Sequence, residues 1–560
     1  MPFRRGILLA AALALLFLLA NRAAYKGYFS GDDLDNLLQT RGAPLSVFAA
    51  GLASPKLSEW NFRPVGHFYY KALGAAAGLQ FPAYVAVLHL LHLLNVLLLW
   101  RVLRRLGASP LGAGAGAALF AFHMACFDAY WKPMFVFDVA CAFFLLAALL
   151  LYLHGRWLLA LIPYWLAYKS KEPAIALPAL LFLYEWMLGE RRYRRVLPYA
   201  AIALSFGVQA LLANRGAETD YTLRFTPAAV WTTLSFYSSK ILLARYAGLL
   251  LIPAAWLAKD RRIRFGLAAI AVLMGPMWFL PGRLFAVYLY VPLIGLAIAA
   301  AFAAERVTPA CVATFFVLWI PANYVVLRQQ RGVTLAAAQE ARPYVEQVGA
   351  TLSAHPEWNS IVYDGAPRSL ERWGVRAAFL LPRGGGDRKV EPLDSPEGRA
   401  MLQQAAVQTA AWNAGRRRVE WQARVPGAPE PSYIDMARGN PAWLFGAGWY
   451  GVEAGYRWMQ AEARAVLQRP TAARKFAVRL NFGPVQFRDQ GEIELEVLFD
   501  GRSLGTRQYG EQGWHERRWA LPAGAAGPVT VTLRSLRPYR PSNGDPRLLG
   551  AAVAAFGFIE

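Results

Sequence analysis

The stretch from residue 135 to residue 153, FVFDVACAFFLLAALLLYL, contains one charged side chain, Asp138. An α-helix needs about 20 apolar residues to cross the hydrocarbon core of a bilayer. Comparable runs recur along the first 330 residues, whereas charged residues, glycine and proline return every few positions beyond them. The sequence therefore predicts a membrane-embedded helical region followed by a water-soluble part.

Composition supports the same division. Hydrophobic residues make up 56% of the 560 residues, above the roughly 45–50% of soluble domains. The net charge of +23 comes partly from basic clusters between apolar runs, a distribution that orients a membrane protein and argues against a nucleic-acid partner. The cysteines, Cys126, Cys141 and Cys311, lie in or beside apolar runs, so no disulfide framework or zinc motif is expected.

Eleven membrane spans are predicted, with the first as an uncleaved signal anchor. If they are correct, the basic clusters fall on one side, which the positive-inside rule assigns to the cytoplasm. We therefore expect a multi-pass protein of a bacterial inner membrane, with a cytoplasmic N-terminus and a periplasmic or extracellular C-terminal part. The predicted spans are 6–21, 83–103, 108–126, 135–153, 156–169, 173–189, 196–213, 241–258, 266–280, 284–304 and 308–327.

The predicted fold class is a polytopic α-helical membrane protein with a C-terminal, mostly-β soluble domain. Residues 1–330 form the membrane domain with an outer loop at 21–82, and 331–430 form a small α/β connection. That connection is expected to contain strands at 360–364 and 376–381 and a helix at 397–414. In 431–560, alternating runs separated by turn residues indicate an antiparallel β-sandwich, as at 475–480, 492–499 and 529–533.

Three aspartates follow the first predicted span, in the segment Gly31-Asp32-Asp33-Leu34-Asp35-Asn36. Carboxylates so close together repel one another, which can raise one pKa and leave a catalytic base or a cation site. Alternatively, Asp32 or Asp33 caps a helix over 34–40 by accepting hydrogen bonds from its first amides. Both interpretations stay open, because the two members of the pair can differ in role.

Farther along the outer loop, Arg63 is a candidate for holding two phosphate oxygens with its planar guanidinium; the alternative is an anchor to lipid headgroups. His67 follows in the same segment. In the next predicted span, His89 and His92 share a helix face. No third metal ligand accompanies them, so packing or interhelical hydrogen bonding is the favoured interpretation of both.

Several of these motifs together resemble the GT-C superfamily of membrane glycosyltransferases, in the branch related to protein O-mannosyltransferases and their bacterial relatives. They are the acidic pair, the Arg63-Pro64 step, the helix from His89 to Asn95, and Ser170-Lys171-Glu172-Pro173. The resemblance implies transfer of a sugar from a polyprenyl phosphate or diphosphate on the non-cytoplasmic face. It also implies an acidic catalytic residue in the first outer loop, here Asp32 or Asp33.

Charged side chains near the outer ends of the predicted spans are candidates for binding the sugar donor, because charges there are costly unless they have a function. The alternative is that the lysines extend to the interface and only fix helix position. A divalent cation, Mg²⁺ or Mn²⁺, could share the phosphate, although no ligand set is visible. These candidate residues are Lys132, Asp138, Lys171 and Glu172, beside Arg63 and His67.

The acceptor is a glycan, a lipid or a protein, and the sequence does not choose among them. Exposed aromatic residues on a β-sandwich could stack on sugar rings, although core packing is the commoner role. Two other functions remain open. One is a polysaccharide ligase or polymerase of the O-antigen type, relying on Arg224 or His67. The other is a non-catalytic transporter or glycan-binding protein.

Overall fold

A computed structural model describes residues 2–56, 62–213, 219–382, 385–404, 406–425, 427, 430–439, 441–522, 524–542 and 544–560. These residues divide into two compact units. The helical unit comprises Met1–Phe29 and Asn36–Ala338, and the second unit comprises Ser30–Asp35 and Gln339–Glu560.

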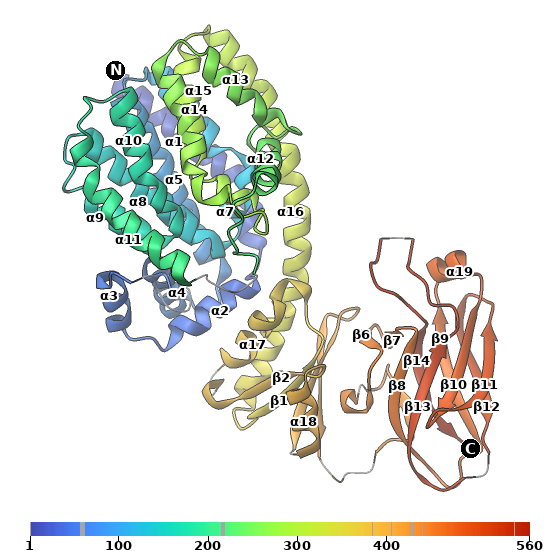
Figure 1. Cartoon of the computed structure of the whole chain (residues 1–560). Coiled ribbons are helices and arrows are strands. Elements are labelled where there is room, and N and C mark those ends of the chain that lie inside the picture. Colours follow the sequence, from blue (N-terminus) through green and yellow to red (C-terminus); the bar gives the residue numbers. More distant parts are fainter. Residues whose placement is uncertain are drawn as a thin grey trace. The chain divides into compact units, whose positions relative to one another are not determined.

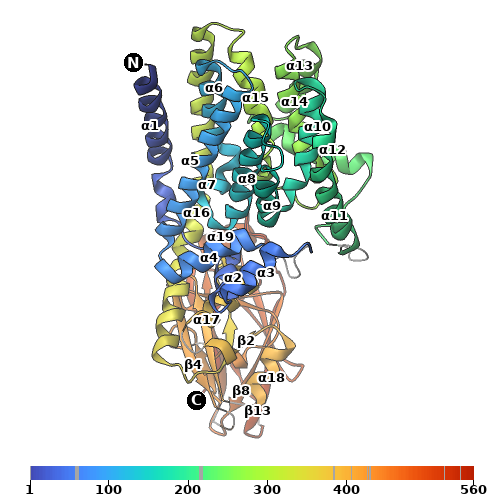
Figure 2. The same cartoon turned by 90° about the vertical axis from the view of Figure 1, so that its left-hand side faces the viewer.

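Helices make up nearly all of the helical unit, and Figure 2 shows its longer helices running side by side. They are α1 (Pro2–Ala20), α2 (Gly31–Arg41), α3 (Leu45–Ala53), α4 (Pro64–Ala77), α5 (Phe81–Arg105), α6 (Pro110–Ala121), α7 (Phe127–Trp131), α8 (Val136–Leu153), α9 (Leu161–Ser170), α10 (Leu177–Met187), α11 (Leu197–Ala213), α12 (Pro227–Ile241), α13 (Leu251–Leu257), α14 (Arg261–Leu273), α15 (Leu293–Ala304) and α16 (Pro309–Ala354).

Four helical stretches of the described chain are long and apolar enough to cross a membrane: Phe81–Arg105, Pro110–Trp131, Pro133–Leu153 and Pro309–Ala354. Their outer surfaces are apolar as well. On α16, Val317 and Leu318 are 68% and 69% exposed. Apolar side chains exposed in such a continuous surface require lipid rather than water around them, so the helical unit is of the membrane type.

The basic segments gather at one end of the helical unit. Arg105 Nε donates to the Leu153 carbonyl at 3.0 Å, which joins the last turns of α5 and α8. Asp260, just before α14, binds both Arg262 at 2.8 Å and Arg306, beyond the end of α15, at 2.7 Å. The Ser109 amide, in the loop after α5, donates to Glu305 and so joins these two groups. Four of the predicted basic clusters, at 101–105, 154–156, 259–264 and 305–306, therefore share one end of the bundle.

Several predicted spans differ from the structure, and the predicted number of eleven is not confirmed: 156–169 and 284–304, for example, become α-helical only at Leu161 and Leu293. The stretch 241–258 is not one helix, because α12 ends at Ile241 and the chain turns through Leu243 and Tyr246, both with φ of +57°. Such left-handed residues end a helix. The span predicted at 308–327 belongs to α16, which continues to Ala354.

The second unit begins with a four-stranded sheet in the order β2-β1-β3-β4, accompanied by α17 (Glu371–Leu380) and α18 (Pro396–Gln404) (Figure 1). The central strand β1 is parallel to β2 and to β3, whereas β4 is antiparallel to β3. The bounds are β1 (Ser360–Asp364), β2 (Lys389–Pro392), β3 (Val407–Asn413) and β4 (Arg418–Arg424).

Two predictions in this region were wrong. The strand predicted at 376–381 lies within helix α17, where Val375, Ala378 and Phe379 are buried at helical spacing. The helix predicted at 397–414 ends at Gln404, and its second half is strand β3. Because β3 lies between two other strands and is buried on both faces, its residues lack the alternation that reveals a strand.

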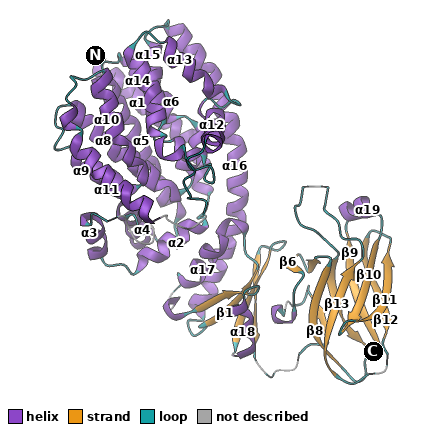
Figure 3. Cartoon of the chain, viewed as in Figure 1, coloured by secondary structure: helices purple, strands orange, loops and turns teal. Residues whose placement is uncertain are grey.

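Two antiparallel sheets complete the second unit (Figure 3). One has the order β11-β10-β13-β8, and the other β12-β9-β14-β7-β6 with β5 paired to β14. Both contribute to one core, for example Phe476 and Leu495, so the predicted sandwich is confirmed. The bounds are β5 (Tyr433–Asp435), β6 (Trp449–Glu453), β7 (Tyr456–Met459), β8 (Glu462–Arg469), β9 (Lys475–Phe482), β10 (Ile493–Phe499), β11 (Arg502–Tyr509), β12 (Gly513–Ala520), β13 (Gly527–Ser535) and β14 (Ala552–Ile559).

Candidate functional site

Four of the candidate residues form two neighbouring ion pairs in the helical unit. Arg63 donates to Glu172 Oε1 from Nε at 2.9 Å and approaches the same oxygen with a terminal nitrogen at 2.8 Å. Lys171 Nζ donates to Asp138 Oδ2 at 2.6 Å. The two pairs are adjacent because Lys171 and Glu172 are consecutive. Lys171 follows the end of α9, and Glu172 begins the 3-10 turn Glu172–Ala176.

The cluster lies at the end of the bundle opposite the basic segments. Asp138 is in the first turn of α8, and Leu153, which ends α8, receives the hydrogen bond of Arg105 at the basic end. Fifteen residues of helix separate them, a distance of about 22 Å. The cluster therefore lies about 22 Å along α8 from the basic end, less than the roughly 30 Å thickness of the hydrocarbon core of a bilayer.

Burial and charge both act on the Arg63–Glu172 pair. Burial by itself would lower the pKa of Arg63 and raise that of Glu172. Their mutual attraction outweighs burial in both cases, so the pKa of Arg63 is raised above its ordinary value and the pKa of Glu172 is lowered below its ordinary value. Both groups are charged at neutral pH. Because the Glu172 side chain is 44% exposed, a ligand can reach the pair.

His67 contacts the backbone of Arg63. Its Nδ1 lies 3.0 Å from the Arg63 amide nitrogen and 2.9 Å from the Arg63 carbonyl oxygen, and its ring packs against Phe137 with centroids 5.2 Å apart. Burial lowers the pKa of His67 to about 4, so the ring is neutral at pH 7. The structure thus gives His67 a positioning contact to the backbone of Arg63 rather than a charged contact to ligand.

A glycine permits this packing. An ideal Cβ on Gly66 would lie 2.1 Å from the Phe137 ring, so α4 approaches α8 closely only because Gly66 has no side chain. Arg63, the residue before α4, stands with its guanidinium carbon 5.7 Å from the centroid of the same ring. The Gly66–Phe137 contact therefore sets the position of Arg63.

Lys132 pairs with a residue outside the cluster. It forms an ion pair with Asp128, four residues earlier, at 2.8 Å. His89 and His92 make interhelical hydrogen bonds: His89 Nε2 is 2.9 Å from the Tyr130 carbonyl, and His92 Nδ1 is 2.7 Å from the Tyr290 hydroxyl. Both histidines are buried, as the packing interpretation of this helix predicted.

The acidic pair belongs to the second unit, and its members have different surroundings. Asp33 is buried and closes the first turn of α2: its Oδ2 accepts from the Ser30 amide at 2.8 Å and from the Ser30 hydroxyl at 2.7 Å. This is a capping-box arrangement, in which the third residue of a helix reaches back to the residue before it. The expected helix start at residue 34 is therefore wrong: α2 begins at Gly31, Ser30 precedes it as the cap, and Asp33 contributes to capping from inside the helix rather than as its N-cap.

Asp32 faces a helix of the same unit. Trp373 Nε1, on α17, donates to Asp32 Oδ1 at 2.8 Å. Two glycines allow this approach, since an added Cβ on Gly31 would lie 2.0 Å from the Leu370 carbonyl oxygen and one on Gly374 2.2 Å from the Gly31 Cα. Burial and then the charge of Asp32 raise the pKa of Glu371. Asp32 is thus a partly exposed carboxylate with a fixed orientation.

Sequence spacing missed Arg283 and the two tyrosines near it. Lys171 Nζ lies 5.2 Å from the ring centroid of Tyr288, and the Tyr288 ring packs edge-on against Phe285, over which Arg283 stands at 4.8 Å. Arg283 also stacks over Tyr221 at 4.3 Å. The available signal was an arginine in the Pro281-Gly282-Arg283 turn between two predicted spans, on the same side as Arg63.

The described residues do not fit a metal cage of side chains. Among them, no three histidine, cysteine, aspartate or glutamate side chains come together closely enough to hold a metal ion. The carboxylates of the cluster are already bound to Arg63 and Lys171. No catalytic step is therefore derived through the divalent cation that the sequence left open.

Comparisons with known proteins give distant similarities. No protein-family model and no curated protein matches the chain. Among solved structures, it is similar to ArnT from Cupriavidus metallidurans bound to undecaprenyl phosphate, with 14% identity and a TM-score of 0.44 over 75% of this chain and 98% of that one.

Two mycobacterial structures are similar as well. One is arabinofuranosyltransferase AftD from Mycobacteria, with 12% identity and a TM-score of 0.43 over 98% of this chain and 58% of that one. The other is arabinosyltransferase EmbB from Mycobacterium smegmatis, with 12% identity and a TM-score of 0.37 over 98% of this chain and 64% of that one. The chain spans less than two thirds of the length of either mycobacterial protein.

Proposed function

We propose that this chain is a membrane glycosyltransferase that transfers a sugar from a polyprenyl-phosphate carrier to an acceptor at the outer face of a bacterial inner membrane. The observation that carries the proposal is the cluster of two cations, Arg63 and Lys171, with the carboxylates Glu172 and Asp138, beside the first turn of α8 in an apolar helical unit. A prenyl chain needs hydrocarbon, and its phosphate needs cations at the surface of that hydrocarbon.

Arg63 and Lys171 suit the phosphate of such a carrier for different reasons. The guanidinium of Arg63 presents parallel N–H groups that match two phosphate oxygens, whereas the ammonium of Lys171 acts as a compact charge. In this proposal both stabilise the negative charge that grows on the phosphate as the sugar departs. Charge stabilisation of this kind is usually the largest contribution to the rate.

Asp32 is the proposed general base, as the resemblance to GT-C glycosyltransferases also implies. Its carboxylate would accept the proton of the acceptor hydroxyl while that oxygen forms a bond to the anomeric carbon. The bond between the anomeric carbon and the phosphate oxygen breaks, and the electron pair leaves with the prenyl phosphate. The partial exposure of Asp32 and the burial of Asp33 in its capping box favour Asp32 for this role.

The proposed orientation is supported by α16. This helix begins at Pro309, just after Arg306 at the basic end of the bundle. Its residues 309–338 belong to the helical unit and span about 45 Å, more than the roughly 30 Å of hydrocarbon in a bilayer. If the basic end is cytoplasmic, as the positive-inside rule suggests, the chain beyond α16 lies outside.

Substitution of the acidic residues tests the proposal. Asp32→Asn is expected to lower sugar transfer from a polyprenyl-phosphate donor by at least about a hundredfold, the typical loss of a general base. Asp33→Asn is expected to lower the unfolding free energy by about 1 kcal/mol through the weakened cap, with less effect on the rate.

The matched control is Asp35→Asn, which removes a third carboxylate from the same helix. Transfer is measured with purified, detergent-solubilised protein at equal folded concentration. Transfer rates unchanged by both Asp32→Asn and Asp33→Asn would remove the catalytic assignment.

A further inference from the structure

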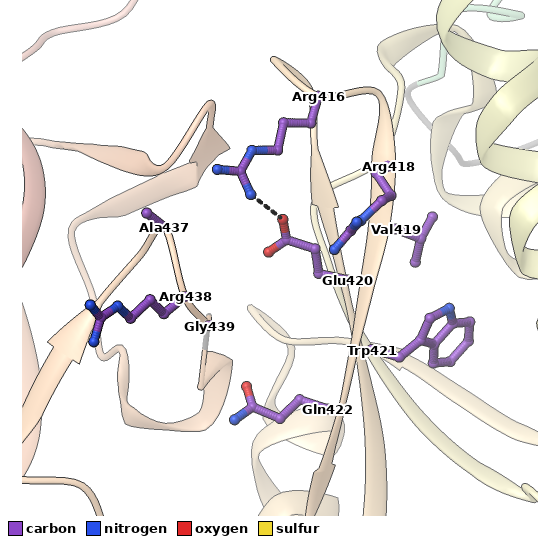
Figure 4. Close-up of a pocket in the computed structure, with 9 residues that line it drawn as sticks. All are labelled: Arg416, Arg418, Val419, Glu420, Trp421, Gln422, Ala437, Arg438 and Gly439. Carbon is purple, nitrogen blue, oxygen red and sulfur yellow. Dashed lines mark ion pairs between the residues drawn. The ribbon is translucent and has the colours of Figure 1, made fainter.

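A cavity of about 400 Å³ lies in the second unit, between β4 and the turn that follows β5 (Figure 4). Strand β4 alternates its side chains, so Val419 and Trp421 point to one side of the sheet and Glu420 points to the other, into the cavity. Ala437 to Gly439 form the opposite wall. The cavity is therefore lined on one side by a strand and on the other by a turn.

Positive charge dominates the lining. Arg416 and Arg418 lie beside the single lining carboxylate, Glu420, whereas the Arg438 side chain points away from it and pairs with Asp435 at 3.6 Å. The Arg416 guanidinium lies 3.9 Å from Glu420, a distance too long for a strong hydrogen bond. Arg418 forms no ion pair with any residue that the structure describes. The lining thus carries more positive charge than its own carboxylate neutralises, and a ligand can supply the missing anion.

The walls are held rigidly together. Asn413, at the end of β3, is buried, and its Oδ1 accepts from the amides of Arg416 at 3.0 Å and Ala454 at 3.1 Å. Arg457 on β7 is also buried and forms an ion pair with Asp364 at the end of β1. These contacts connect the four-stranded sheet to the sandwich, so the arginines are placed on a preformed surface rather than on a free hairpin.

Two aromatic residues of the sandwich follow a glycine that lies next to the cavity wall. An ideal Cβ on Gly455 would lie 3.4 Å from Ala437 and 3.8 Å from the Arg416 guanidinium. Next to Gly455, the Tyr456 ring is 6.1 Å from that of Trp514, which is 47% exposed. Exposed aromatic faces beside charged groups suit sugar rings, whose C–H groups pack on them while hydroxyl groups are hydrogen-bonded.

We propose that this cavity binds an oxyanion, a carboxylate or a phosphate ester, carried by a saccharide whose neighbouring rings contact Tyr456 and Trp514. Arg416 and Arg418 hold the anion, and Gln422 provides a further hydrogen-bond donor at the cavity wall. The site is distinct from the residues proposed for sugar transfer, and its ligand binds without a sugar donor. An acidic glycan is thereby the class of molecule that the second unit selects.

Binding to the full-length, detergent-solubilised protein tests the site by isothermal calorimetry. The probes are oligogalacturonate, a phosphorylated oligosaccharide, a neutral glucose oligosaccharide of equal length, and inorganic phosphate. We expect the two charged saccharides to bind more tightly than the neutral one, with affinity that falls at high salt. The charged saccharide that binds more tightly identifies the oxyanion as a carboxylate or a phosphate ester.

Variants locate the binding. Arg416→Gln combined with Arg418→Gln is expected to weaken charged-saccharide binding by about ten- to a hundredfold. Arg399→Gln combined with Arg502→Gln, an equal charge change at two exposed positions of the same unit, is the control. Trp514→Ala is expected to weaken binding of the saccharide but not of phosphate. Asp32→Asn is expected to leave binding unchanged, which separates this test from that of sugar transfer.

Three results would overturn the proposal. One is equal binding of neutral and charged oligosaccharides, and another is equal affinity for inorganic phosphate and the charged saccharides. The third is unchanged affinity in the Arg416→Gln, Arg418→Gln variant when its thermal unfolding matches that of the unmodified protein. A variant that loses sugar transfer but still binds the charged saccharides is informative about the catalytic proposal and not about this site.

Discussion

Asp32 and Asp33 are adjacent in the sequence, but their carboxylates accept hydrogen bonds from different partners. The Asp33 carboxylate is bound to the backbone and hydroxyl of Ser30, whereas the Asp32 carboxylate accepts from an indole on another helix. Adjacent residues at the start of a helix point about 100° apart, so one side chain can cap the helix while the other points away from it. A single sequence cannot reveal which of the two does so.

Trp373 provides a test at the level of one hydrogen bond. In Trp373→Phe, Asp32 loses the N–H that orients it, and we expect the transfer rate to fall by about tenfold, the value of a hydrogen bond to a charged group. The maximal rate is expected to change more than the Michaelis constant for the sugar donor. Trp373→His, which retains a ring N–H, is expected to restore part of the rate, and a loss of folded protein in both variants would contradict this role.

His67 predicts a pH dependence of stability. Burial holds its pKa at about 4 in the folded protein, compared with 6.5 for an unperturbed histidine. Between these values the unfolded chain binds more protons, so the unfolding free energy is complete above pH 6.5 and falls as the pH drops toward 4. The full change is about 3 kcal/mol.

The measurement is thermal unfolding of the detergent-solubilised protein at several pH values. His67→Asn, which keeps an acceptor near the Arg63 amide, is expected to remove this part of the slope. An equal slope in the variant and the unmodified protein would show that His67 does not titrate in this way.

At the scale of helices and strands, the apolar pattern was most informative where an element has one buried face. Strands β9 and β13 alternate and were predicted near their true bounds. Strand β3 is buried on both faces and resembled a helix, and α17 was taken for a strand because a short apolar run fits either period. Arg283 was missed because its partner Tyr221 is distant in the sequence.

The contact between α4 and α8 can be tested with one methyl group. In Gly66→Ala, the new Cβ would collide with Phe137, so α4 must move and displace Arg63. We expect a loss of about 1–3 kcal/mol in unfolding free energy, as for other overpacked sites, and weaker binding of the sugar donor.

Phe137→Leu added to Gly66→Ala makes room for the methyl group, and it is expected to restore part of both properties. The measurements are chemical unfolding and binding of a polyprenyl phosphate. If the double variant has the same unfolding free energy and the same affinity for polyprenyl phosphate as Gly66→Ala, the collision with Phe137 is not the cause of the loss.

For the whole molecule, the native cysteines allow a test of orientation. Cys126 and Cys141 are buried, whereas Cys311 is exposed in the first turn of α16, close to the basic end. If that end is cytoplasmic, a membrane-impermeant maleimide is expected to label Cys311 only after cells are permeabilised.

A second position gives the complementary result. Ser353 is exposed near the far end of α16, and Ser353→Cys in a Cys311→Ser background is expected to be labelled in intact spheroplasts. Labelling of Cys311 in intact spheroplasts, or protection of the new cysteine there, would reverse the proposed topology.

The ion pairs of the cluster also affect how fast such an enzyme could release its spent carrier and begin another cycle. Arg63 and Lys171 already form ion pairs with Glu172 and Asp138. Neither cation therefore needs a bound phosphate to balance its charge. An arriving phosphate would exchange with a carboxylate, gaining one contact as another is given up. Such exchange favours moderate affinity and rapid departure of the spent carrier, which lets a small pool of lipid be reused many times.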